Sequence, residues 1–180
     1  KTDREINAFL GPHHVTSLID TVKLRGRDIV CLKTSLGEKK ERALILVHGS
    51  PGSLDVFLDY MVDTSLLNRV DVVTFDRPGF GNSGFGIAEP LLLHQGEILD
   101  DLMDSLGYHN YILAGHSYGA PVLLEAAIRR PGQVSGLCFI AGSISPELEP
   151  KSTGWRKWID LPLLRDLLPV SMRVSNEELM

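Results

Sequence analysis

The sequence predicts an α/β fold built on a doubly wound, mostly parallel sheet with helices on both faces. Three observations support this fold class. Short apolar segments alternate with amphipathic ones along most of the chain. Residues 43–47 form a continuous apolar run, which is typical of a strand buried on both faces. Residues 111–114 form another run, and a helical pattern follows closely, so right-handed crossovers are expected.

The elements of the first half begin with a hairpin. Residues 15–23 and 29–34 are predicted strands, and the segment Arg25-Gly26-Arg27-Asp28 between them has turn character. A charged loop then leads into the strand at 43–47. The pattern over 54–62 predicts a helix, and 70–75 is the next expected strand. We therefore expect an antiparallel hairpin attached to a parallel sheet.

The second half continues the alternation. Residues 76–84 are dense in turn residues, and 91–106 predict an amphipathic helix that stops at Gly107. The strand at 111–114 and a helix at 120–130 follow, and 134–140 supply one more strand. After Ala141 the character changes. Residues 155–168 are aromatic and leucine-rich with interrupting prolines, which favours short amphipathic helices over a site instead of another strand–helix unit.

Composition fits one folded domain and excludes several classes of function. The chain has 180 residues, 43% of them hydrophobic, and a net charge of −5, which is too apolar for disorder and gives no reason to expect nucleic acid as a partner. No apolar run approaches membrane-spanning length. Residues 1–10 are too polar for a signal peptide, so the compartment stays open, with the cytoplasm slightly favoured. Cys31 and Cys138 fall in predicted strands, where buried free thiols are expected.

The segment Gly-His-Ser-Tyr-Gly at 115–119 carries the main functional prediction. It matches Gly-x-Ser-x-Gly, it follows an apolar strand, and it opens a helix, which is the context of a nucleophile elbow. The two glycines are expected because a Cβ there would collide with the neighbouring strand or helix. We therefore expect Ser117 to be a nucleophile, the alternative being an ordinary glycine-rich turn.

A serine nucleophile also needs donors for the oxyanion that forms when it attacks a carbonyl. The backbone N–H of Tyr118 directly follows the nucleophile at the start of a helix, where the helix dipole favours negative charge. The second donor should come from the loop after the strand at 43–47. Pro51 has no N–H there, so Ser50 is the natural candidate. The alternative is a plain turn that leads to a helix capped by Ser53.

Three motifs together resemble the landmarks of the α/β-hydrolase fold, in that family's order. They are His-Gly-Ser-Pro-Gly at 48–52, Asp-Arg-Pro-Gly-Phe-Gly-Asn-Ser at 76–83, and the elbow at 115–119. The resemblance implies a Ser–His–acid triad, an oxyanion hole at Ser50 and Tyr118, and a helical cap after the strand ending near Ala141. It assigns residues 1–146 to the N-terminal part of the core and 147–180 to the beginning of the cap. The C-terminal part of the core is then expected to lie outside these residues.

The resemblance also exposes a departure. The family's triad runs nucleophile, acid, histidine along the chain, but no histidine follows Ser117. His116 should point away from the hydroxyl, and His48 is expected to have a structural hydrogen-bonding role. The other histidines are expected on the surface: His13, His14, His94 and His109. No acid stands out among the candidates Glu147, Glu149, Asp160 and Asp166. We expect the acid and base beyond residue 180, and the 180 residues alone to be inactive.

The sequence therefore predicts a hydrolase of the ester or related acyl bond of a small molecule, without cofactor or metal. No His/Cys spacing suits zinc, and the Gly79-x-Gly81-x-x-Gly84 match to a dinucleotide fingerprint lacks a prompt helix. Relatives that are haloalkane dehalogenases or epoxide hydrolases use aspartate at the elbow, so the serine argues against those activities. Thioester hydrolysis, carbon–carbon bond hydrolysis and perhydrolysis share the apparatus. The rival is a non-catalytic protein that binds a small ligand or partner on the same scaffold, and the oligomeric state is open.

Overall fold

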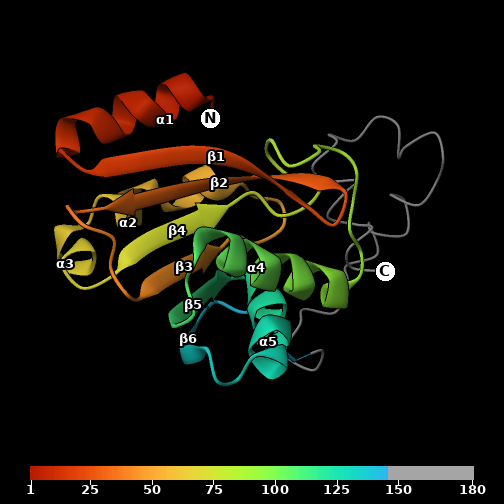
Figure 1. Cartoon of the computed structure of the whole chain (residues 1–180). Coiled ribbons are helices and arrows are strands. Elements are labelled where there is room, and N and C mark those ends of the chain that lie inside the picture. Colours follow the sequence, from red (N-terminus) through yellow and green to blue (C-terminus); the bar gives the residue numbers. More distant parts are fainter. Residues whose placement is uncertain (146–180) are drawn as a thin grey trace.

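The computed structural model describes residues 1–145 and contains a six-stranded sheet in that part of the chain (Figure 1). The strand order is β1-β2-β4-β3-β5-β6. The strands are β1 (Thr16–Leu24), β2 (Arg27–Ser35), β3 (Ala43–Val47), β4 (Asp71–Phe75), β5 (Tyr111–His116) and β6 (Val134–Ile140). The expected cap, residues 147–180, lies outside the described residues.

The sheet is mostly parallel, with an antiparallel pair at its N-terminal edge. β4, β3, β5 and β6 run parallel to one another, while β1 and β2 form a hairpin whose second strand pairs antiparallel with β4. In the register, Val47 of β3 pairs with both Phe75 of β4 and Gly115 of β5. The carboxyl ends of these three strands therefore meet at one edge. The predicted fold class is confirmed.

Helices cover both faces, as the apolar runs of the strands require. The helices are α1 (Asp3–Leu10), α2 (Leu58–Met61), α3 (Thr64–Leu67), α4 (Leu92–Leu106) and α5 (Gly119–Arg129), with single 3₁₀ turns η1 (Gly11–His13) and η2 (Leu54–Phe57). Alternate residues of β2 enter different cores. Ile29 and Cys31 pack with α4 and α5, whereas Val30 and Leu32 pack with α1, α2 and α3. This period of two gives a three-layer, doubly wound arrangement.

Helix α4 shows how the sequence sets its own ends and partner. Its apolar residues Ile98, Leu99, Leu102 and Met103 recur at helical spacing and are buried. Gly107 ends the helix with φ at 69°, a left-handed conformation that glycine adopts without strain. At Gly96 a Cβ would stand 2.7 Å from the Cγ of Glu125, so the absence of a side chain lets α5 approach closely. α4 and α5 consequently pack side by side, with α5 against β5 and β3 and α4 also in contact with β1 (Figure 1).

Three local expectations need correction or addition. The helix expected over 54–62 is divided into η2 and α2 at Phe57, whose backbone leaves the helical conformation with φ −107° and ψ 10°. A separate helix, α3, follows Asp63, which accepts hydrogen bonds from the N–H groups of Ser65 and Leu66. Cys138 is exposed, not buried, because the described residues leave its side of the outermost strand β6 uncovered, whereas Cys31 is buried as expected. The polar N-terminal segment forms α1, which begins with a capping box between Thr2 and Glu5.

Candidate active site

Ser117 stands at the carboxyl end of β5 in a strained backbone conformation. Its φ is 50°, a left-handed value that costs a non-glycine residue about 1–2 kcal/mol. The bend is held from both sides. The N–H of Ser117 donates to the carbonyl of Ile140 at 3.0 Å, and its own carbonyl accepts from Ala120 at 3.0 Å and Ser143 at 3.2 Å. The strand therefore turns sharply into α5 at this residue, whose side chain is half-buried.

Close packing explains why glycines flank the bend. A Cβ on Gly115 would overlap the side chain of Leu123 on α5, and a Cβ on Gly119 would overlap the carbonyl oxygen of Val47 on β3. A Cβ on Gly49 would stand 2.8 Å from the Cβ of Ser117 itself. The steric reason predicted for the two glycines of the motif thus holds, and the loop after β3 touches the serine directly.

The structure brings the three predicted site residues to the same edge of the sheet. β3 and β5 are neighbours, and the register pairs Val47 with Gly115, so the loop at 48–54 and the elbow leave the sheet side by side. Ser50 is half-buried within that loop, and Tyr118 is buried where α5 begins. The register therefore brings the loop that contains Ser50 and the elbow that contains Ser117 and Tyr118 to one edge of the sheet.

His48 is a buried, neutral ring that holds the backbone. Its Nε2 accepts the N–H of Arg77 at 2.9 Å, so its proton lies on Nδ1, which donates to the carbonyl of Gly49 at 2.8 Å. Burial, reinforced by the nearby Arg77 guanidinium, lowers the pKa of His48 from 6.5 to about 3. The ring is thus fully engaged in structure, which is the role expected for it, and it is not available as a base.

Sequence reasoning missed Arg77, which is the largest fully buried side chain among residues 1–145. Its Nε donates to the carbonyl of His48 at 2.9 Å, and its Nη2 donates to the carbonyl of Gly49 at 3.1 Å and to the Oγ of Ser50 at 2.6 Å. The guanidinium carbon also lies 5.1 Å from the ring centre of Tyr118. One side chain therefore contacts three consecutive loop residues and both residues nominated as oxyanion donors.

The neighbours of Arg77 extend this network. Its Nη1 donates to the Oε1 of Gln95 on α4 at 2.7 Å, and its guanidinium lies 4.7 Å from the ring centre of Phe80. The preceding residue, Asp76, is buried and accepts the N–H groups of Leu54 and Asn82, both at 2.7 Å. Burial raises the pKa of Asp76 despite these bonds. Adjacent residues Asp76 and Arg77 thus hold the two ends of the 48–54 loop.

The remaining histidines are placed elsewhere in the described part of the chain. His13, His14 and His109 are exposed, as expected. His94 is also exposed, with its Nδ1 3.3 Å from the Oε1 of Glu89. His116 is exposed, and its Nδ1 lies against Gly49. The four candidates for the acid of the triad, residues 147, 149, 160 and 166, lie outside the described residues.

The described residues contain neither a metal-binding cluster nor a membrane-spanning helix. Within residues 1–145 there is no group of three or more His, Cys, Asp and Glu side chains arranged to hold a metal ion. No helix in that range is both long and apolar enough to cross a bilayer. A hollow of about 240 Å³ beside the 48–54 loop is lined by Ser53, Leu54, Asp76 and Phe85 among others, but neither Ser117 nor Ser50 lines it.

Comparison with known proteins assigns the family. A family model described as alpha/beta hydrolase fold matches residues 42–163, which is more than half of the chain. The chain belongs to this family. The match spans both the loop that contains Ser50 and the elbow that contains Ser117.

Individual relatives of the chain carry several activities in their names. A dihydrolipoyllysine-residue acetyltransferase component of an acetoin cleaving system from Pseudomonas putida is 33% identical over 108 residues, which is 60% of this chain and 29% of that protein. A juvenile hormone epoxide hydrolase from Bombyx mori is 27% identical over 110 residues, 57% of this chain and 24% of that protein. The solved structure of a membrane phospholipase A, described as a bacterial virulence factor, has a TM-score of 0.66 at 27% identity, covering 78% of this chain and 44% of that one.

The chain spans less than a third of the length of these two curated relatives. The family model describes the alpha/beta hydrolase fold, and the relatives and solved structures include hydrolases. They do not share one substrate.

Proposed function

We propose that this chain carries the nucleophile and the oxyanion donors of a serine hydrolase that cleaves an ester or related acyl bond of a small molecule. The observation that carries the proposal is the placement of Ser117, which stands at φ 50° on a bend between β5 and α5, directly against Gly49. Strain of this kind persists only where the surroundings enforce it, and it clusters at functional sites.

In the proposed reaction, the Oγ of Ser117 attacks the substrate carbonyl and forms an acyl-enzyme. The backbone N–H groups of Ser50 and Tyr118 hold the oxyanion, and the N-terminus of α5 adds a favourable dipole. A histidine oriented by an acid takes the proton of Ser117 and later activates water. His48, the only buried histidine among the described residues, is fully engaged by Arg77 and Gly49 and is not that base.

The names of the relatives do not transfer directly. Serine at position 117 argues against the epoxide hydrolase activity named for the Bombyx mori relative, since such relatives are expected to use aspartate there. Acyl chemistry fits both the acetyltransferase and the phospholipase names, and it is the chemistry that a serine facing two amide donors performs. The class of acyl substrate is not defined by the described residues.

The test is Ser117→Ala in the full-length natural protein, with hydrolysis of short p-nitrophenyl esters as the assay. We expect turnover to be lost and the melting temperature to stay nearly unchanged, because alanine keeps the Cβ and the backbone strain. Retained turnover would remove Ser117 from its role. A fluorophosphonate probe addresses the rival: labelling at Ser117 supports the enzyme, whereas an intact fold without labelling supports a ligand-binding protein.

A further inference from the structure

We infer that Arg77 is a positioning residue for the oxyanion hole, which orients and polarises the peptide between Gly49 and Ser50. This inference rests on the proposed function, because it gives a task to the Ser50 amide at that site. Nothing in the sequence pattern distinguishes Arg77 from the turn residues around it. Its contacts do, since three consecutive loop residues, 48, 49 and 50, accept hydrogen bonds from its guanidinium.

The peptide that joins Gly49 to Ser50 is the important group. A peptide unit is planar, and in the trans form its C=O and N–H point in opposite directions. Fixing the direction of the Gly49 carbonyl therefore fixes the direction of the Ser50 N–H, the nominated oxyanion donor. The Gly49 carbonyl is held by two donors at once, the Nδ1 of His48 at 2.8 Å and the Nη2 of Arg77 at 3.1 Å. Two donors on one carbonyl oxygen restrict the rotation of this plane.

Polarisation acts in the same direction as positioning. A donor bound to a carbonyl draws electron density away from the N–H of the same peptide, which makes that N–H a stronger donor. Here the donor is a permanently charged guanidinium with no exposed surface, so solvent does not screen its field. The Ser50 N–H should consequently bind developing negative charge more strongly than an ordinary amide does.

The shape of arginine is required for this role. Its Nε, Nη1 and Nη2 donate in three directions, to the His48 carbonyl, to Gln95 and to the pair Gly49 and Ser50. A lysine ammonium has one nitrogen at the end of a flexible stem and cannot reach these sites together. Gln95 in turn donates to the carbonyl of Glu89 at 2.7 Å, so Arg77 links the loop to the rigid start of α4.

The experiment compares Arg77→Lys with Arg27→Lys in the full-length natural protein. Arg27 is a matched control, because its guanidinium binds two carbonyls and a carboxylate, those of Ile87, Ala88 and Glu89, at 3.0–3.1 Å. It holds a different loop and none of residues 48–50.

We expect Arg77→Lys to lower kcat for p-nitrophenyl butyrate roughly 10- to 100-fold and to leave KM within about threefold. The binding of butylboronic acid, an analogue of the tetrahedral intermediate, should weaken in parallel with kcat. Arg27→Lys should leave all three within about twofold.

A KM effect without a kcat effect, or equal effects of the two substitutions, would overturn the inference. If Arg77→Lys does not fold, Gln95→Leu replaces it, since it removes the anchor of Arg77 but keeps the guanidinium, and a smaller loss of kcat in the same direction is expected.

A second readout does not need turnover. The amide proton of Ser50, followed by NMR, should shift upfield in Arg77→Lys and not in Arg27→Lys, because the peptide loses its polarising donor. An unmoved Ser50 resonance would overturn the inference even in an active enzyme. Absence of turnover in the wild type, or turnover that survives Ser117→Ala, would instead remove the proposed function, so the two failures are distinguishable.

Discussion

Gly49 and Ser117 are in direct contact, although 68 positions separate them in the chain. A Cβ on Gly49 would lie 2.8 Å from the Cβ of Ser117, 3.0 Å from the carbonyl oxygen of His116 and 3.1 Å from its Nδ1. Two of these three atoms belong to the strained elbow and its backbone, which cannot move as the tip of a flexible side chain would. The loop after β3 and the bend after β5 therefore form one packed unit.

Gly49→Ala should damage activity more than it damages stability. The added methyl group has to displace the loop or the elbow, and a shift of a few tenths of an ångström alters the distance between the hydroxyl and the amide donors. We expect kcat for p-nitrophenyl esters to fall at least tenfold and the free energy of unfolding to fall by about 1–3 kcal/mol. Gly132→Ala is the control, because no atom lies within 4 Å of its added Cβ, and it should leave both quantities nearly unchanged.

The elements that could be predicted from sequence are those whose pattern is local. The strand at 134–140, the stop of α4 at Gly107 and the bend at Ser117 each follow from a few neighbouring residues, and each is present. The division of the 54–62 helix lies at Phe57, which leaves the helical conformation, and the cap at Asp63 that begins α3 was not anticipated. Exposure of Cys138 depended on what covers β6, which no local pattern encodes.

The placement of the nominated residues could be predicted for the same reason, and their roles stay predictions. Ser117, Ser50 and Tyr118 belong to short motifs, so their proximity could be expected once the strands were ordered. Arg77 lies in a segment whose glycines and proline indicated only a turn, and its value comes from distant partners such as Gln95. Arg77 lies two positions after a strand that is buried along its length, but the charged Asp76 follows the same strand, so this local feature does not single Arg77 out.

The neutral ring of His48 should make the protein lose stability as the pH falls. The pKa of this group is about 3 in the folded protein and 6.5 when unfolded, so the unfolded chain binds a proton that the folded one refuses. The stabilisation is complete above pH 6.5 and is lost as the pH falls toward 3. When the pH falls from 7.5 to 5, which is 1.5 units below 6.5, the free energy of unfolding falls by about 2 kcal/mol because of this group.

Urea denaturation at pH 7.5 and at pH 5 measures this effect. His48→Gln should be less stable at pH 7.5, since buried bonds are lost, but it should show a smaller difference between the two pH values than the wild type does. His109→Gln removes an exposed histidine and should keep the wild-type difference. An undiminished difference in His48→Gln would show that other groups cause the acid sensitivity.

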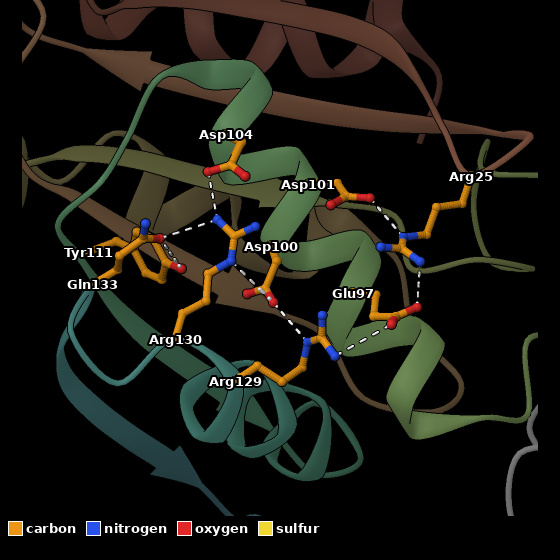
Figure 2. A network of polar contacts seen from close by, with 9 residues as sticks. All are labelled: Arg25, Glu97, Asp100, Asp101, Asp104, Tyr111, Arg129, Arg130 and Gln133. Carbon is orange, nitrogen blue, oxygen red and sulfur yellow. Dashed lines mark hydrogen bonds and ion pairs between the residues drawn. The ribbon is translucent and has the colours of Figure 1, made fainter.

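Asp100 should contribute more to stability than Asp104, although both pair with Arg130 across the α4–α5 seam (Figure 2). The side chain of Asp100 is 1% exposed and also pairs with Arg129 at 3.0 Å, whereas that of Asp104 is 43% exposed. Asp100→Ala leaves two arginines beside a buried space, but both are partly exposed and keep partners in Glu97 and Asp104. We therefore expect a loss of about 2 kcal/mol, below the 3–5 kcal/mol typical of a fully buried pair.

Asp104→Ala is the matched comparison and should cost less than about 1 kcal/mol, because solvent screens its ion pair even though the 2.6 Å contact to Arg130 is the shorter one. Urea denaturation at neutral pH measures both variants. Burial, not contact distance, is the quantity that separates them in this argument. Equal losses, or a larger loss for Asp104→Ala, would mean that the shorter contact decides and that the buried carboxylate of Asp100 contributes little to holding α4 against α5.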